Sequence, residues 1–274
     1  MTRTRFGLLA IALVLLATAA GCAGGAQQPV ATFTARDFSF SGPETVPAGF
    51  VRFELVNAGS RAHMLGIVSL GDGRTADDLL KDVRDHANAP FPAYATQLGG
   101  PDAVDPGAES IAYADLKPGH YAVFCQMPDG DTGHSHLDLG MIRSFTVTGS
   151  GPTESAPEVS GSLDATDFSF KLDKPLAAGS QTFQVRNSGR QQHEAQLARL
   201  PTGVSVNQYI ALNDATSITA GASYGGLAPI PAGTNGYFNA YFTPGSYAFI
   251  CFVTDPQTGK AHFELGQTLE FTVR

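Results

Sequence analysis

The 274-residue sequence has few charged residues, few cysteines and a single long hydrophobic run, and these scarcities limit what the protein can be. Only 15% of the residues are charged, whereas glycine (31) and proline (17) are frequent. This composition suits β-rich domains with many turns better than a helical bundle. The length allows about two domains of ordinary size.

The one long hydrophobic run covers residues 6–20 and follows the basic start MTRTR. It is shorter than the ~20 residues that a membrane-spanning helix needs. A basic head, an apolar core and a small-residue end such as AAGC form, in that order, a secretory signal peptide. A cysteine directly after Ala-Ala-Gly also resembles a bacterial lipobox, although Ala19 stands where that motif usually has leucine. We therefore expect a signal peptide over residues 1–21, a lipid on Cys22 and a short tether over residues 22–32.

Plain secretion and a single N-terminal membrane anchor are the alternatives to this lipoprotein. No second hydrophobic run is long enough to cross a membrane, so we expect the globular part at the outer face of a bacterial cytoplasmic membrane. Removal of residues 1–21 leaves 15 basic and 25 acidic residues, a net charge of −10. An acidic surface disfavours binding to nucleic acid or to anionic lipid and favours a basic protein partner.

The chain repeats itself. The segment ARDFSFSGPETVPAGFVRFELVNAGSRAH begins at Ala35 and matches ATDFSFKLDKPLAAGSQTFQVRNSGRQQH, which begins at Ala165. Further on, LKPGHYAVFC at residues 116–125 matches FTPGSYAFIC at residues 242–251. A stretch rich in glycine, serine, proline and threonine separates the copies and indicates a linker. We therefore expect domain 1 over residues 33–148, a linker over residues 149–162 and domain 2 over residues 163–274.

The sequence of each half predicts an all-β domain. Short runs such as FVRFELVN, QTFQVRN and HYAVFCQM are rich in β-formers, and several alternate between apolar and polar residues as half-buried strands do. Each half should therefore form a Greek-key β-sandwich of about seven or eight strands. A short helix is expected in the middle of each half, after Thr75 in the first copy and after Ser205 in the second.

Metal-binding residue types keep their register across the repeat, although much around them differs. The repeated positions are His63, Cys125 and His136 in the first half and His193, Cys251 and His262 in the second. A disulfide is the default expectation for two cysteines in an oxidising compartment. Here it would join equivalent points of two separate domains, so a buried structural thiol or a metal ligand is the better interpretation.

One more side chain follows each second histidine by five residues: Met141 in HLDLGM and Gln267 in HFELGQ. Two imidazoles, one thiolate and a weak axial methionine or glutamine are the ligand set of a blue-copper site. The thiolate and the thioether favour Cu(I), whereas the imidazoles tolerate both oxidation states. His134 also lies nearby, but the repeat register and the spacing to Met141 both select His136.

These motifs together resemble the cupredoxin family, which includes plastocyanins and the type 1 domains of copper nitrite reductases. The resemblance rests on NAGSRAH and NSGRQQH, on the PG-Y-C pattern before each cysteine, and on His-x4-Met or His-x4-Gln after it. It implies two tandem cupredoxin-like domains with one copper ion in each, more strongly in domain 1 than in domain 2. The implied ligands are His63, Cys125, His136 and Met141 in domain 1, and His193, Cys251, His262 and Gln267 in domain 2.

Ten residues separate the cysteine from the second histidine in both copies, which makes a longer loop than in plastocyanin-like proteins and one nearer to that of nitrite reductases. A multicopper oxidase, however, needs more histidines for its trinuclear cluster than the seven of this chain. Resemblance to the type 2 copper site of nitrite reductases would require a histidine directly before the cysteine. In this chain, Phe124 and Ile250 occupy those positions. We therefore expect no enzyme.

The sequence thus predicts an extracytoplasmic copper-binding lipoprotein that transfers single electrons to a redox or copper-handling protein. A metal-free surface module for protein interaction and a copper storage or delivery protein are the two alternatives. The other histidines should lie at the surface, and Met64 and Met127 should pack in the core.

Overall fold

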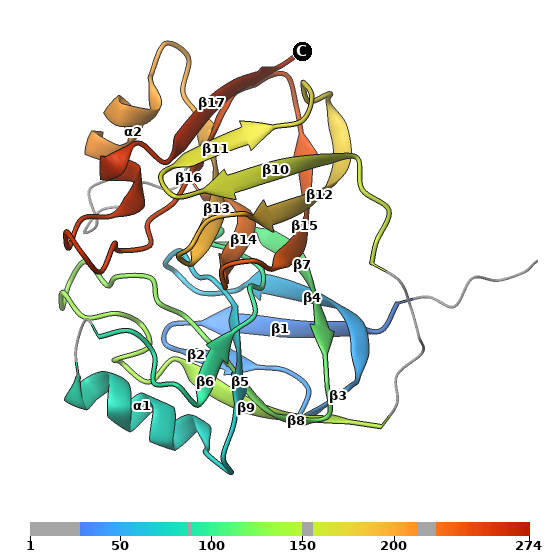
Figure 1. The fold of residues 1–274 in the computed structure, drawn as a ribbon, viewed down its shortest axis with the longest axis vertical. Coiled ribbons are helices and arrows are strands. Elements are labelled where there is room, and N and C mark those ends of the chain that lie inside the picture. Colours follow the sequence, from blue (N-terminus) through green and yellow to red (C-terminus); the bar gives the residue numbers. More distant parts are fainter. Residues whose placement is uncertain (1–27, 87–88, 150–155, 213–222) are drawn as a thin grey trace, which may run out of the picture.

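The computed structural model describes residues 28–86, 89–149, 156–212 and 223–274. The expected signal peptide, Cys22 and much of the expected linker lie outside these residues. No helix in the described part of the chain is long and apolar enough to cross a membrane. Figure 1 shows two β domains on top of each other, with the first, in blue to green, below the second, in yellow to red.

The structure confirms the predicted fold class: each domain is built from strands and has one short α-helix. Domain 1 has strands β1 (Val30–Arg36), β2 (Ser39–Ser41), β3 (Thr45–Pro47), β4 (Gly49–Asn57), β5 (Gly66–Leu70), β6 (Ala95–Gln97), β7 (Glu109–Leu116), β8 (Gly119–Phe124) and β9 (Ile142–Thr148), with helix α1 (Ala76–Asp85) between β5 and β6. Domain 2 has strands β10 (Gly161–Thr166), β11 (Ser169–Leu172), β12 (Gly179–Asn187), β13 (His193–Leu200), β14 (Ser223–Ile230), β15 (Asn235–Phe242), β16 (Gly245–Ile250) and β17 (Thr268–Val273), with helix α2 (Val206–Leu212) and the 3-10 helix η1 (His262–Leu265).

The strands form two layers in each domain, and one layer continues across the domain boundary. The shared sheet has the order β11-β10-β12-β15-β7-β4-β1-β2. The sheet β3-β9-β8-β5-β6 closes domain 1, and the sheet β14-β13-β16-β17 closes domain 2. Strands β7 and β15 hold equivalent places in the two copies and pair antiparallel, with Ala112 opposite Phe238. The two domains are therefore joined by backbone hydrogen bonds as well as by the linker.

Alternating side chains fill the space between the layers. In β4, every second residue from Val51 to Asn57 is buried. The ring of Phe53 lies 6.2 Å from that of Phe33 and 6.1 Å from that of Phe145, measured between centroids. In domain 2 the ring of Phe183 stacks on Phe238 in a similar way. Because each buried phenylalanine contributes about 1.5–3 kcal/mol to folding, these rings hold the layers together.

Each helix covers the outer face of one of the smaller sheets. The hydroxyl of Thr75 accepts the N–H of Asp78, and the Asp78 carboxylate accepts the N–H of Thr75, so that the two residues form a capping box at the start of α1. Ser205 and Gln208 exchange the same two bonds at the start of α2. Both helices begin where the sequence predicted.

Equivalent residues of the two domains form the same contacts with each other across the domain boundary. The N–H of Ala228 donates to the carbonyl of Gly100 at 2.9 Å, and the N–H of Asp102 donates to the carbonyl of Gly226 at 3.3 Å. Both glycines have a positive φ, and a Cβ on either would lie within 2.2 Å of a backbone oxygen, that of Leu65 at Gly100 and that of Ala195 at Gly226. Each domain thus presents the same segment to the other, as the two subunits of a two-fold dimer do.

Two candidate metal centres

Four of the predicted ligand residues lie directly beside the last two strands of each domain. Cys125 and Cys251 directly follow β8 and β16, and Met141 and Gln267 directly precede β9 and β17. The N–H of Cys125 donates to the carbonyl of Met141 at 3.1 Å, and the N–H of Cys251 donates to that of Gln267 at 3.3 Å. These bonds close the base of each loop, so that the last two strands hold both of its ends.

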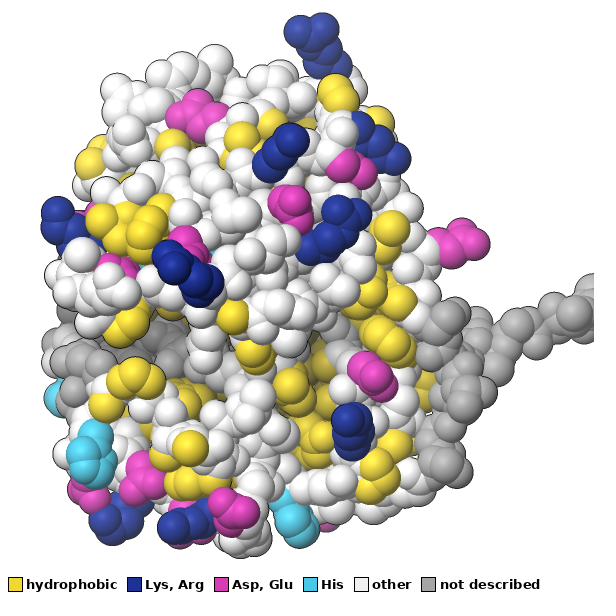
Figure 2. Space-filling model, viewed as in Figure 1, with side chains coloured by type: hydrophobic (Ala, Val, Ile, Leu, Met, Phe, Trp, Pro, Cys, Tyr) yellow, Lys and Arg dark blue, Asp and Glu magenta, His cyan; other side chains and the backbone are white. Residues whose placement is uncertain are grey.

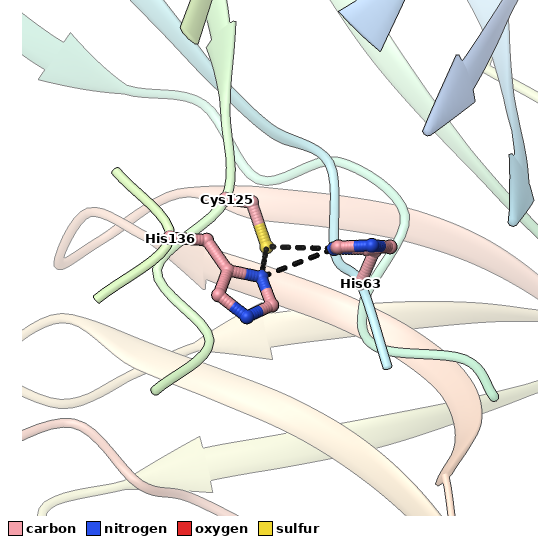
Figure 3. Close-up of side chains that lie close together, drawn as sticks. All are labelled: His63, Cys125 and His136. Atoms are coloured by element: carbon pink, nitrogen blue, oxygen red, sulfur yellow. Dashed lines mark hydrogen bonds between the residues drawn. The ribbon is translucent and has the colours of Figure 1, made fainter. Parts of the chain in front are cut away.

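In domain 1, three ligand atoms converge on one buried point (Figure 3). His63 Nδ1 lies 3.1 Å from His136 Nδ1 and 3.9 Å from Cys125 Sγ, and this sulfur lies 3.4 Å from His136 Nδ1. The three residues are at most 1% exposed. Together they could hold one metal ion.

Domain 2 repeats this arrangement. The distance between His193 Nδ1 and His262 Nδ1 is 3.1 Å, and Cys251 Sγ lies 4.0 Å from the first nitrogen and 3.4 Å from the second. All three residues are fully buried. The two cysteines are free and belong to different sites.

Met141 and Gln267 are also fully buried. Met141 packs in the same core cluster as Cys125. The amide nitrogen of Gln267 donates to the carbonyl of Thr166 at 3.1 Å, whereas its Oε1 has no hydrogen-bond partner among the described residues. Burial lowers the pKa of His193 and of His262, and the nearby amide of Gln267 opposes that shift. A buried, unpartnered oxygen beside two imidazoles fits a site for a cation.

An aspartate orients the first histidine of each site. His63 Nε2–H donates to Asp37 Oδ1 at 2.8 Å, and His193 Nε2–H donates to Asp167 Oδ1 at 3.1 Å. Burial raises the pKa of Asp37, but hydrogen bonds from Ser60 and His63 outweigh it and bring that pKa down to about 2. Because an ionised carboxylate only accepts hydrogen bonds, the ring proton sits on Nε2 and the lone pair of Nδ1 faces the site.

The repeated glycines make room for these carboxylates. A Cβ on Gly59 would lie 2.5 Å from Asp37 Oδ1 and 2.7 Å from His63 Nε2. A Cβ on Gly189 would lie 2.4 Å from Asp167 Oδ1 and 2.5 Å from His193 Nε2. Any larger residue at either position would therefore push the carboxylate away from the imidazole.

A buried asparagine shapes the loop before each first histidine. The amide nitrogen of Asn57 donates to the carbonyls of Arg61 and Val104, and its oxygen accepts the N–H of Gly59. Asn187 makes the equivalent three bonds in domain 2. The sequence paired these asparagines, glycines and aspartates across the repeat but gave them no role. Their shared register was the signal that could have assigned one.

Burial also sets the protonation of the ligands without metal. It lowers the pKa of all four site histidines, that of His136 to about 4. It raises the pKa of Cys125 to about 12 and that of Cys251 well above its ordinary value. At neutral pH the imidazoles are therefore ready to bind a metal, whereas each thiol must first lose a proton.

The donor set fits copper. A thiolate is soft, imidazole binds both copper oxidation states, and a weak axial methionine or glutamine completes the blue-copper pattern. Each domain thus holds one His-Cys-His group that suits one copper ion. His86, His120 and His134 are exposed, as expected, and Met64 and Met127 are buried in the core of domain 1.

Comparison with known proteins gives structural likeness at low sequence identity. No protein-family model and no curated protein matches the chain. Auracyanin from Roseiflexus castenholzii is 21% identical, with 46% of this chain and 100% of that chain covered and a TM-score of 0.30. Auracyanin A, a blue copper protein from Chloroflexus aurantiacus, is 16% identical, with 44% and 100% covered and a TM-score of 0.32.

A multicopper oxidase is 15% identical, with 90% of this chain and 89% of that chain covered and a TM-score of 0.26. Likeness at these TM-scores carries no argument about function, so the choice of metal rests on the side chains described above. The absence of catalysis stays a prediction.

Proposed function

We propose that the protein binds one copper ion in each domain and carries single electrons. The observation that carries the proposal is the convergence of two imidazole Nδ1 atoms and one cysteine sulfur on a buried point in both domains. Asp37 and Asp167 keep the lone pairs of His63 and His193 turned inward.

When bound, copper would supply a one-electron couple, and the chain's own residues suit that chemistry. Each cysteine directly follows a paired strand, and the backbone N–H groups of His63, His136 and His262 donate to carbonyls of neighbouring segments, which limits how far these ligands can move between oxidation states. Two backbone N–H groups face each sulfur: those of Met64 and Met127 at Cys125, and those of Glu194 and Val253 at Cys251. These donors stabilise a thiolate, and burial keeps water and other ligands away from the site.

The proposal assigns no catalytic centre. In the part of the chain that the structure describes, the two His-Cys-His groups are the clusters of three or more metal-binding side chains. A reaction on oxygen or nitrite would need a further metal site close to one of them.

Purified apo protein loaded with Cu(II) tests this function against its alternatives. We expect two copper ions per chain and a reversible one-electron oxidation and reduction of each, without consumption of oxygen or nitrite. A chain that takes up several Cu(I) ions and exchanges no electrons with mediators would be a storage or delivery protein. A chain that binds no copper would be a metal-free interaction module.

The location is a separate part of the proposal. The AAGC sequence motivates a lipid on Cys22 and a place at the outer face of a bacterial cytoplasmic membrane. The partner would be a redox or copper-handling protein, with a basic surface favoured by the net charge of −10 after cleavage. On the face shown in Figure 2, acidic and basic side chains are scattered among each other, so this face offers no patch of one sign.

Fractionation of cells tests the location directly. Wild-type protein should sediment with membranes, and Cys22→Ala should be released or left unprocessed. A mature N-terminus that carries no lipid would contradict the lipoprotein assignment and leave the copper proposal unaffected.

A further inference from the structure

Besides Met141 and Gln267, the two sites differ at a residue that contacts the loop carrying the second histidine. Arg61 in domain 1 and Gln191 in domain 2 hold the same place, two residues before the first histidine. Each of these two side chains reaches a buried aspartate in the ligand loop, which is the loop between the cysteine and the second histidine. Arg61 Nη1 lies 2.8 Å from Asp129 Oδ1, and the amide nitrogen of Gln191 donates to Asp255 Oδ1 at 2.9 Å.

Gln191 has a second contact that Arg61 cannot make. Because its NH2 group faces the Asp255 carboxylate, its Oε1 must face the other way, toward His262 Nε2 at 3.0 Å. An amide oxygen only accepts, so His262 carries its proton on Nε2. The lone pair of His262 Nδ1 then faces the metal site.

The corresponding nitrogen in domain 1 has no such acceptor. His136 Nε2 is buried and without a hydrogen-bond partner among the described residues. The guanidinium of Arg61 has donors and no acceptor, and the ring of Phe38 packs against His136 edge-on. Nothing described around His136 Nε2 therefore favours a proton there.

This difference determines where the histidine ring protons lie in each metal-free site. In domain 1, His136 can carry its proton on Nδ1 and donate it to His63 Nδ1, 3.1 Å away. In domain 2, Asp167 and Gln191 hold both ring protons on Nε2, so two lone pairs face each other at 3.1 Å. The Cys251 thiol can donate to only one of them, which leaves the other acceptor unpaired.

We infer that Gln191 is a positioning residue that holds His262 in its metal-binding tautomer, so that domain 2 takes up a metal ion more tightly than domain 1. This inference rests on the proposed function, because it presumes that both sites bind metal. It reverses the order that the sequence favoured. In domain 2, a cation relieves the repulsion between the lone pairs, whereas domain 1 must first move a proton to a nitrogen that has no acceptor.

Nitrogen NMR of the apo protein at neutral pH reads the tautomers directly. We expect a proton on Nε2 for His262 and on Nδ1 for His136. In Gln191→Met, which keeps the volume and removes the acceptor, His262 should move toward the Nδ1-protonated form. In Arg61→Gln, His136 should move toward the Nε2-protonated form. A merely structural role of Gln191 would leave the ring of His262 in the same tautomer.

Cobalt(II) titration of single-site proteins measures the consequence, because Co(II) bound to a thiolate absorbs strongly. Cys125→Ser leaves site 2 to be measured, and Cys251→Ser leaves site 1. We expect site 2 to bind about 10- to 100-fold more tightly, the usual effect of a partner behind a ligating histidine. Gln191→Met should remove that advantage in the Cys125→Ser background, and Arg61→Gln should tighten site 1 in the Cys251→Ser background.

The outcomes separate the two proposals. Equal affinities, or a His262 tautomer that Gln191→Met leaves unchanged, would overturn the role of Gln191 and leave the copper sites standing. If neither Co(II) nor Cu(II) binds either site, the proposed function itself fails.

Discussion

At the scale of single residues, the site depends on groups behind the ligands as much as on the ligands. The histidines and cysteines could be identified from the repeat because metal-binding residue types are rare in this chain. The repeat also marked Asp37 as a shared position but not its contact, since it lies 26 residues before His63 in the sequence and only the fold brings its carboxylate to the imidazole. The different contacts of Arg61 and Gln191 were equally hidden, because they depend on the direction of each side chain.

Gly59→Ala tests the fit between carboxylate and imidazole. The new Cβ would collide with Asp37 Oδ1 and His63 Nε2, so the pair must separate. We expect the metal affinity of site 1 to fall about 10- to 100-fold, as for other lost partners of ligating histidines, while site 2 keeps its affinity. Gly119→Ala is the control, because a Cβ there has no atom nearer than 3.7 Å. Equal affinities in both variants would contradict this account of Gly59.

The buried histidines also predict how the apo protein responds to acid. In the unfolded chain a histidine has a pKa near 6.5, whereas burial, with repulsion from His63, lowers the pKa of His136 to about 4. Below pH 6.5 the unfolded chain therefore binds protons that the folded chain does not bind. Stability should be full above that pH and fall as the pH drops toward 4, with a slope of up to about 1.4 kcal/mol per pH unit for each such histidine.

Urea unfolding of the apo protein between pH 7 and 5 measures this loss. His136→Gln should lose less stability over the same range, because one of the titrating groups is gone. The exposed His134→Gln serves as the matched control and should behave as the wild type. Stability that stays constant or rises as the pH falls would contradict the prediction.

Among the helices, strands and loops, the sequence predicted those features that interactions between near neighbours in the chain determine. The helix starts at Thr75 and Ser205 were visible because capping residues act within one turn. The ligand loop was visible only as a long insertion between cysteine and histidine. In the structure an aspartate organises it: the Asp129 carboxylate accepts the N–H and the hydroxyl of Thr132, and Asp255 does the same with Thr258.

Asp255→Ala tests whether this turn supports the metal site. The variant removes the two bonds to Thr258 and the bond that orients the amide of Gln191. We expect the affinity of site 2 for Co(II) to fall about tenfold or more, with site 1 unchanged. The exposed Glu264→Ala lies in the same loop and would show whether any charge change there has this effect. If both variants bind Co(II) as the wild type does, the turn has no role in the site.

At the scale of the whole molecule, the repeat predicted two domains but not their shared sheet. Pairing of β7 with β15 joins residues far apart in the chain, and no local pattern marks which edge strand will meet which. One alanine of each domain also packs in the core of the other domain. Ala112 of β7 packs in the core of domain 2, and Ala228 of β14 packs in the core of domain 1.

Because of this exchange, we expect the two domains to unfold together. Phe238 lies on β15, is fully buried, and pairs with β7 of domain 1. Phe238→Ala should lower the free energy of unfolding by about 3–5 kcal/mol and shift a single transition seen by all probes. Calorimetry of the apo protein checks this. Two separate transitions, with only that of domain 2 shifted, would show that the domains fold independently.

The proposed copper site of each domain consists of one cysteine and two histidines. Titration of apo protein with Cu(II), followed by absorption, tests it most directly, because a copper thiolate gives an intense charge-transfer band. We expect saturation at two ions per chain, and one ion with part of the band in Cys125→Ser and in Cys251→Ser. Absence of the band, or a band that survives unchanged in both cysteine variants, would contradict it.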